Sequence, residues 1–352
     1  MWPILLAILF FAMIITIHEF GHFFTAKLFR IKVNEFSIGM GPAILKKKKG
    51  ETQYSLRILP IGGYCAMEGE DGDSEDQNAF GKKAAWKRFI VVAAGAAMNI
   101  LLGIIFVTVI VCMDDLIPTP QINYFYENAY SEAGGLQEKD VILKVNGSRV
   151  FTTRDLSYEL ARDKDAVYDF VVRRDGVKVN VDGVAFQTVE TEDGKTDIVY
   201  DFTVVGVKKT FFNVIGSSLK ESYSIARIVW KSLFDLVTGR YGLHDLSGPI
   251  GTIKIIANAA SEAASDSHQG SIIGLETLIN IMAFISINLG VFNLLPIPAL
   301  DGGRLFFILC EMIRRKPILP KYEKYVHAAG MVLLLLLMAV VSVNDIINLI
   351  RG

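Results

Sequence analysis

The chain has 352 residues, of which 51% are hydrophobic and only 21% are charged, and its mean hydropathy is +0.38. This composition is too apolar for an ordinary soluble enzyme and indicates a membrane protein with polar parts. The formal net charge of -1 excludes a globally basic surface, so we expect no nucleic acid partner. The three cysteines, Cys65, Cys112 and Cys310, lie far apart, which argues against a disulfide framework or a cysteine metal site.

Four segments are long and apolar enough to cross about 30 Å of hydrocarbon, which takes roughly 20 helical residues. They are residues 3–25, 89–113, 275–299 and 327–349. The first is not expected to be a cleaved signal peptide, because it starts without a basic region and no small-residue cleavage site follows its apolar core.

Lysine and arginine residues gather on one side of these spans. They follow the first span, precede the second and follow the third, whereas none lies in 114–130 or 255–275. Basic residues next to spans stay in the cytoplasm, so we expect residues 27–88 and 304–326 to be cytoplasmic. Residues 114–274 and both chain ends should then be outside.

Residues 31–67 predict a β-hairpin. The stretches "KVNEFSIGMGPAIL" and "YSLRILPIGGY" are largely apolar with some alternation, and Lys46–Gly50 between them has the composition of a turn. A sheet this apolar beside a membrane helix favours a hairpin that dips into the bilayer, where its backbone must be buried against protein or line a cavity.

Residues 120–206 predict a separate soluble module. A helix is expected over 153–163, followed by strands over 166–174 and 177–186. Residues 211–238 then carry apolar positions at helical spacing, which predicts an amphipathic helix lying on the membrane or on the module.

The first span ends in "IHEFGHFF", residues 17–24, where three polar side chains interrupt a lipid-soluble run. His18 and His22 are four residues apart and share one helix face, a spacing that suits two ligands of one tetrahedral Zn²⁺. In H-E-x-x-H sites the carboxylate, here Glu19, is the general base for the water that the metal activates. Because a charge in the bilayer is costly, a functional role outweighs chance here.

A catalytic zinc ion needs a third protein ligand and an open fourth position. The stretch "FNLLPIPALDGGR", residues 292–304, offers Asp301, the only carboxylate in this part of the chain. Pro296 and Pro298 prevent a regular helix, and Asn293 adds a donor and an acceptor at membrane depth. Taken alone, the stretch could also be a kinked helix end with a capping aspartate.

H-E-x-x-H in the first span, N-x-x-P-x-P-x-L-D-G in a later one and "SGPIG" before it resemble the site-2 protease family of intramembrane zinc metalloproteases, in its regulator-of-sigma-E protease (RseP-like) branch. "GLQEKDVILKVNG" resembles the signature of a PDZ domain. The resemblance covers nearly the whole chain in the family's order. It implies that a Zn²⁺ cofactor is bound by His18, His22 and Asp301, that Glu19 is the catalytic base, and that substrate is held by Asn293, Pro296 and Pro298.

The same resemblance implies a membrane-reentrant hairpin near 31–65 and transmembrane protein substrates such as anti-sigma factors or leftover signal peptides. It implies a module that excludes substrates with large outer domains. The chain departs from the family in two ways. It has one PDZ-like module where some members have two, and Lys139 stands where bacterial PDZ domains usually have glycine. That lysine places peptide binding by the module in doubt.

The predicted fold is a polytopic α-helical membrane protein with four transmembrane helices, a membrane-associated β-hairpin and an inserted extracytoplasmic PDZ-like α+β domain. We expect it in a bacterial cytoplasmic membrane, with the active site toward the cytoplasm and the oligomeric state open. Its predicted parts are 1–26 (first span), 27–88 (cytoplasmic loop with the hairpin), 89–113 (second span), 120–206 (PDZ-like domain), 207–274 (amphipathic helix region), 275–303 (third span), 304–326 (cytoplasmic loop) and 327–349 (fourth span).

Two other functions compete with proteolysis. One is a catalytically inactive membrane scaffold that works through its PDZ-like module, and the other is a transporter that uses the polar residues as an ion path. Both are disfavoured by the complete H-E-x-x-H motif and Asp301. The remaining histidines, His244, His268 and His327, are expected to be solvated or capping residues. Asn99 is expected to pack and hydrogen-bond against another span.

Overall fold

The computed structural model describes residues 2–351 apart from 71, 73, 163–164, 191–195, 241–255, 257–267 and 317–319. The SGPIG turn at 247–251 and His244 lie outside the described residues. The chain divides into two compact units, one made of Met1–Phe106 with Leu233–Gly352 and the other of Val107–Ser232.

Four helices are long and apolar enough to cross a membrane within the described part of the chain, which confirms that prediction. A helix makes its backbone hydrogen bonds internally, as hydrocarbon requires. The fourth helix begins earlier than the expected residue 327. The four are α1 (Trp2–Leu28), α2 (Ala85–Met113), α7 (His268–Leu294) and α9 (Pro320–Arg351).

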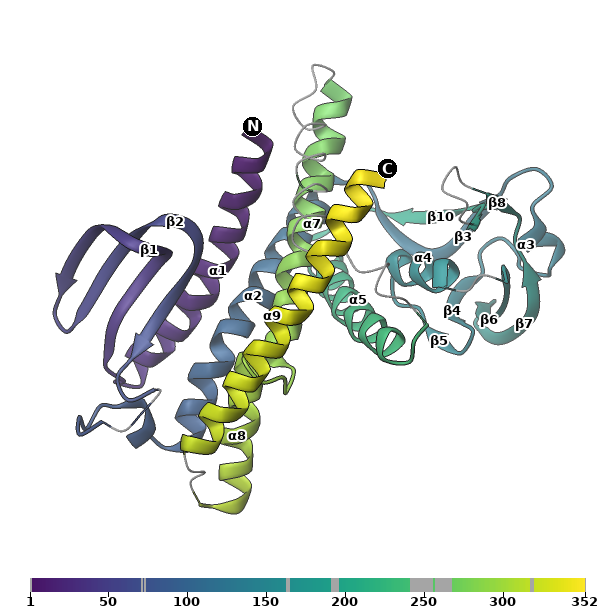
Figure 1. Ribbon diagram of the computed structural model, residues 1–352. Helices are drawn as coiled ribbons and strands as arrows, with labels where there is room; N and C mark the ends of the chain where they lie inside the picture. Colours follow the sequence, from purple (N-terminus) through teal and green to yellow (C-terminus); the bar gives the residue numbers. More distant parts are fainter. Residues whose placement is uncertain are drawn as a thin grey trace. The chain divides into compact units, whose positions relative to one another are not determined.

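In the first unit, strands β1 (Val33–Lys49) and β2 (Thr52–Met67) form an antiparallel hairpin beside α1 (Figure 1). Both strands bend in the middle, so the hairpin folds back on itself. Glu35 in β1 pairs with Gln53 on one side and with Ala66 on the other. The end of β2 is therefore an edge of the sheet, because it pairs only with β1 in the described strands.

One apolar cluster holds this hairpin against the helices. It joins the end of α1 to both strands, to the short helix η1 (Phe80–Lys82), to α2 and to helix α8 (Asp301–Arg314). Burial of this much apolar surface fixes the end of β2 relative to α1 and α8. The buried members are Ala26, Ile31, Val33, Phe36, Cys65, Met67, Phe80, Val91, Val92, Leu305 and Ile308.

The third long helix stops sooner than predicted. The span was expected over 275–299, within a part ending at 303, but α7 ends at Leu294 because Pro296 and Pro298 cannot continue a helix. The chain then turns, and α8 starts at Asp301. The expected loop 304–326 is therefore helical over its first part, since the apolar face of α8 is buried in the cluster described above.

The second unit contains a six-stranded sheet of order β10-β3-β4-β6-β7, with β5 paired to β4, and a separate β8–β9 hairpin. The predicted helix and strands of this region match α4, β6 and β7 to within one residue. The elements are β3 (Ile117–Phe125), α3 (Tyr130–Ala133), β4 (Val141–Val145), β5 (Ser148–Arg149), α4 (Thr153–Arg162), β6 (Val167–Arg174), β7 (Val177–Ala185), β8 (Thr188–Glu190), β9 (Thr196–Ile198) and β10 (Phe202–Val207).

The predicted amphipathic helix is α5 (Phe211–Val237). Its charged side chains form ion pairs with α4. Three ion pairs make this contact: Arg154 with Glu221 at 3.1 Å, Arg227 with the fully buried Asp155 at 2.7 Å, and Lys231 with Glu159. Of the two positions predicted for this helix, the structure shows the one on the module.

Candidate metal centre

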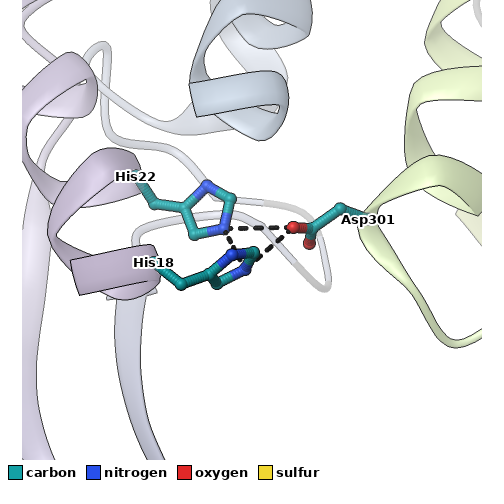
Figure 2. Close-up of side chains that lie close together, drawn as sticks. All are labelled: His18, His22 and Asp301. Carbon is teal, nitrogen blue, oxygen red and sulfur yellow. Dashed lines mark hydrogen bonds and ion pairs between the residues drawn. The ribbon is translucent and has the colours of Figure 1, made fainter. Parts of the chain in front are cut away.

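Two helices bring the predicted ligands together. His18 and His22 project from successive turns of α1, and Asp301 reaches them from the first turn of α8 (Figure 2). Asp301 Oδ2 lies 3.0 Å from His18 Nε2 and 3.3 Å from His22 Nε2, and the two Nε2 atoms are 3.1 Å apart. Both histidines are buried, so three ligand atoms converge on one point inside the protein.

This triangle fits a zinc ion. Zn–N and Zn–O bonds of about 2.0–2.1 Å in a tetrahedron place neighbouring ligand atoms about 3.3 Å apart, close to the separations observed here. Two imidazoles and one carboxylate are a donor set that catalytic zinc sites use, and three protein ligands leave one position open. His18, His22 and Asp301 are the residues that would hold the ion.

Helix α2 forms one wall of the site at Gly95. A Cβ atom at this position would lie 2.4 Å from His22 Nε2 and 2.7 Å from His18 Cε1. Only glycine lets the backbone come this close to both rings. Sequence reasoning missed this residue, because its only signal is the four-residue spacing to Asn99, which puts both residues on one face of the helix.

The other nitrogen of each histidine contacts a polar group. His22 Nδ1 lies 2.8 Å from the backbone oxygen of Val91. His18 Nδ1 lies 3.3 Å from Asn99 Nδ2 and 3.4 Å from Asn293 Nδ2. Asn99 was expected to hydrogen-bond against another span, and its backbone oxygen does accept a bond of 2.7 Å from Ser286 in α7. Its side-chain contact with His18 was not expected.

Glu19 faces a cavity of about 350 Å³ that also reaches His22 and Asp301. The end of β2 lines the same cavity through Tyr64, Cys65, Ala66 and Met67. Arg304 completes the lining and is paired with Glu70, which also borders the cavity. The carboxylate is therefore placed where a water molecule and an extended chain could both reach it.

The remaining predicted site residues lie in and before the turn between α7 and α8. Asn293 is buried next to His18, whereas Pro296 is exposed and Pro298 is half-buried. The turn is held from α9, because Ala299 N donates to His327 Nδ1 at 3.1 Å. His268 is the first residue of α7, and His244 lies outside the described residues.

Comparisons with known proteins show which family of proteins the chain is similar to. The model of the family described as Peptidase family M50 matches residues 6–337. A Clostridium acetobutylicum protein whose name describes a zinc metalloprotease is 36% identical over 350 residues, which cover 98% of this chain and 97% of the relative. Regulator of sigma-W protease RasP of Bacillus subtilis is 28% identical over 422 residues, covering 96% of this chain and 97% of the relative.

Proposed function

The chain belongs to peptidase family M50 and is a zinc metalloprotease, as predicted, and we propose that it cleaves peptide bonds within transmembrane segments of membrane proteins that have already been trimmed. The observation that supports this proposal most directly is the ligand triangle of His18, His22 and Asp301, which opens to a cavity containing Glu19. The two histidines are buried on the candidate membrane helix α1, and Asp301 is on α8. The runner-up function is an inactive membrane scaffold that works through its outer module.

In the proposed mechanism, a zinc ion held by His18, His22 and Asp301 supplies Lewis acidity toward water and the scissile carbonyl. Glu19 accepts the proton of the attacking water and passes it to the leaving amide nitrogen. Its place in the cavity, one residue after a ligand, favours this role.

A substrate helix must become extended before it can be cut, and the edge of the hairpin offers a template. Residues 64–67 at the end of β2 line the cavity with Glu19 and pair with β1 on one side only within the described strands. An extended substrate can add to such an edge through backbone hydrogen bonds. Exposed apolar side chains on the rest of the hairpin support its insertion into the bilayer: Ile38, Met40, Ile44, Leu45, Ile58 and Leu59.

The end of α7 and the turn after it would bind the substrate in addition to the edge of β2. Asn293 supplies a buried amide beside the ligands, and Pro296 and Pro298 keep the segment after it from continuing as a helix. These residues bind substrate rather than taking part in proton transfer.

The protein would sit in a bacterial cytoplasmic membrane with both chain ends outside and the zinc site toward the cytoplasm. The distribution of lysine and arginine supports this orientation. Residues 120–206 would then form a PDZ-like domain outside the cell, which filters substrates by size. The name of the Bacillus relative, regulator of sigma-W protease, supports anti-sigma factors as one substrate class. Signal-peptide remnants are the other class that the family resemblance implies.

The deciding experiment is Glu19→Gln in the purified full chain. We expect the variant to keep one zinc ion, measured by elemental analysis, and to lose at least about 10²-fold in cleavage of a transmembrane substrate in proteoliposomes, because an amide cannot accept the proton. His22→Ala is the matched control and should lose the zinc. Turnover of Glu19→Gln within about tenfold of wild type would refute the base role. A wild-type protein that binds zinc tightly but cleaves nothing would favour the scaffold.

A further inference from the structure

We infer that Asn99 positions His18 for metal binding by accepting a hydrogen bond from His18 Nδ1 through its side-chain oxygen. This inference rests on the proposed assignment of His18 as a zinc ligand. It gives a role to a residue that neither the H-E-x-x-H nor the L-D-G motif contains.

The argument begins with the tautomer of His18. Its Nε2 faces Asp301 Oδ2 at 3.0 Å and His22 Nε2 at 3.1 Å, so this nitrogen is the one that meets the metal. A ligating nitrogen must offer a lone pair, so the proton of the neutral ring lies on Nδ1. Nδ1 is then a donor, and the group beside it has to be an acceptor.

Two amides stand beside that nitrogen, and Asn99 is better placed to accept. Asn99 is fully buried, and its Oδ1 has no hydrogen-bond partner among the residues that the structure describes. As placed, Asn99 Nδ2 lies 3.3 Å from His18 Nδ1. Rotating the amide by a half-turn exchanges its two atoms, so that Oδ1 faces His18 Nδ1. Asn293 is 3.4 Å away, is slightly exposed at 8%, and is the residue that we assign to substrate.

The position of Asn99 is itself fixed. Ser286 Oγ donates to the backbone oxygen of Asn99 at 2.7 Å, which ties α2 to α7 at this residue. Gly95, one turn earlier, allows α2 to approach the two histidines. His22 has an equivalent arrangement, because its Nδ1 lies 2.8 Å from the backbone oxygen of Val91. Both ligands would therefore be oriented from α2, one by a backbone group and one by Asn99.

The test measures zinc affinity of the purified full chain by competition with a chelator, independently of proteolysis. Asn99→Leu keeps the size of the side chain but removes the acceptor, and we expect zinc to bind about 10- to 100-fold more weakly. Asn99→Asp keeps an oxygen acceptor and should stay within about threefold of wild type or bind more tightly. The visible spectrum of the cobalt-substituted protein should change in Asn99→Leu and be restored in Asn99→Asp.

Asn293→Leu is the matched control for the second amide, and its zinc affinity should remain within about threefold of wild type. Equal losses in Asn99→Leu and Asn293→Leu would overturn the assignment to Asn99, as would wild-type affinity in Asn99→Leu. Should Asn99→Leu fail to fold, Asn99→Ala takes its place with the same expected loss, and wild-type zinc affinity in that variant would equally overturn the assignment. Full zinc binding by His18→Ala would instead refute the underlying ligand assignment.

Discussion

At the scale of single residues, Gly95 determines how much room the zinc site has. Replacing it with alanine would place a Cβ atom 2.4 Å from His22 Nε2, well inside van der Waals contact. The ring cannot retreat without losing its contact to the oxygen of Val91. We expect Gly95→Ala to weaken zinc binding by at least about tenfold, measured by chelator competition on the purified protein.

Gly103→Ala is the control for that experiment, because it makes the same change in the same helix. Its Cβ would meet Ile287 Cγ1 at 2.3 Å, so the cost would fall on packing against α7 and not on a ligand. We expect zinc affinity close to that of wild type in this variant. Equal zinc affinity in Gly95→Ala and wild type would show that α2 does not pack closely enough against His18 and His22 to limit zinc binding.

The chemistry-bearing residues of the site could be predicted because their types and spacing carry meaning alone. The spacing of His18 and His22 predicts a metal site, and Glu19 between them predicts a general base. Asp301 is conspicuous because it is a carboxylate in a predicted membrane span. Gly95 and Asn99 carry no such meaning, since their importance depends on which ring faces α2 once the helices have packed. The sequence showed that Gly95 and Asn99 share one face of a helix, but it did not show that this face meets His18 and His22.

At the scale of elements, the sequence predicted secondary structure best where a residue cannot adopt the helical conformation. Pro296 and Pro298 predicted a break, and α7 does end just before them. Helix α8 was missed, because Arg304, Arg314 and Arg315 were interpreted as basic residues of a cytoplasmic loop. Its helical form depends on burial of Leu305 and Ile308 against distant parts of the chain, which local sequence does not contain.

An element-scale prediction concerns the pairing of β4 with β6 in the module of residues 120–206. Arg174 donates to both oxygens of the fully buried Asp140, at 2.8 and 2.7 Å, and this contact raises the pKa of Arg174 above its ordinary value. Arg174→Ala would leave a buried carboxylate uncompensated and destabilise the module by about 3–5 kcal/mol. Hydrogen–deuterium exchange of the β4 and β6 amides should then accelerate at least about 10²-fold.

The neighbouring Arg173 provides the control, because its side chain is exposed. Arg173→Ala should change stability by no more than about 0.5 kcal/mol. Adding Asp140→Asn to Arg174→Ala should recover part of the lost protection, since the buried charge is removed. Unchanged exchange in Arg174→Ala would mean that this ion pair does not hold the two strands.

At the scale of the whole molecule, the proposed orientation places residues 114–274 outside the cell. Glu138 is exposed in this region, so a cysteine there can react with a membrane-impermeant reagent. In a background without the three native cysteines, we expect Glu138→Cys to be labelled in intact cells. Gln77→Cys, exposed in the predicted cytoplasmic loop, should be labelled only after the membrane is opened. The reverse pattern would invert the topology.

The module of residues 120–206 can be removed with little strain, which makes its proposed role testable. Pro118 pairs with Gly206 in the β3–β10 ladder, so the chain ends left by deleting 121–205 lie side by side and a short linker can join them. The deletion also removes α4 and its ion pairs to α5. A control that keeps the module while changing Glu221→Gln and Lys231→Gln breaks two of those three pairs and isolates the effect of a loosened α5.

A filter should act on substrate size and not on chemistry, since residues 120–206 contain no histidine and their acidic residues form no metal-like cluster in the described part. We therefore expect intact enzyme to cut only pre-trimmed substrate. The deletion variant should cut both forms and still require Glu19, whereas the α5 control should behave like intact enzyme. The measurement is the fraction of each substrate cleaved in proteoliposomes. Loss of both activities in a deletion variant that still binds zinc would make the module a docking element, and equal cleavage of both substrates by intact enzyme would mean that no filter exists.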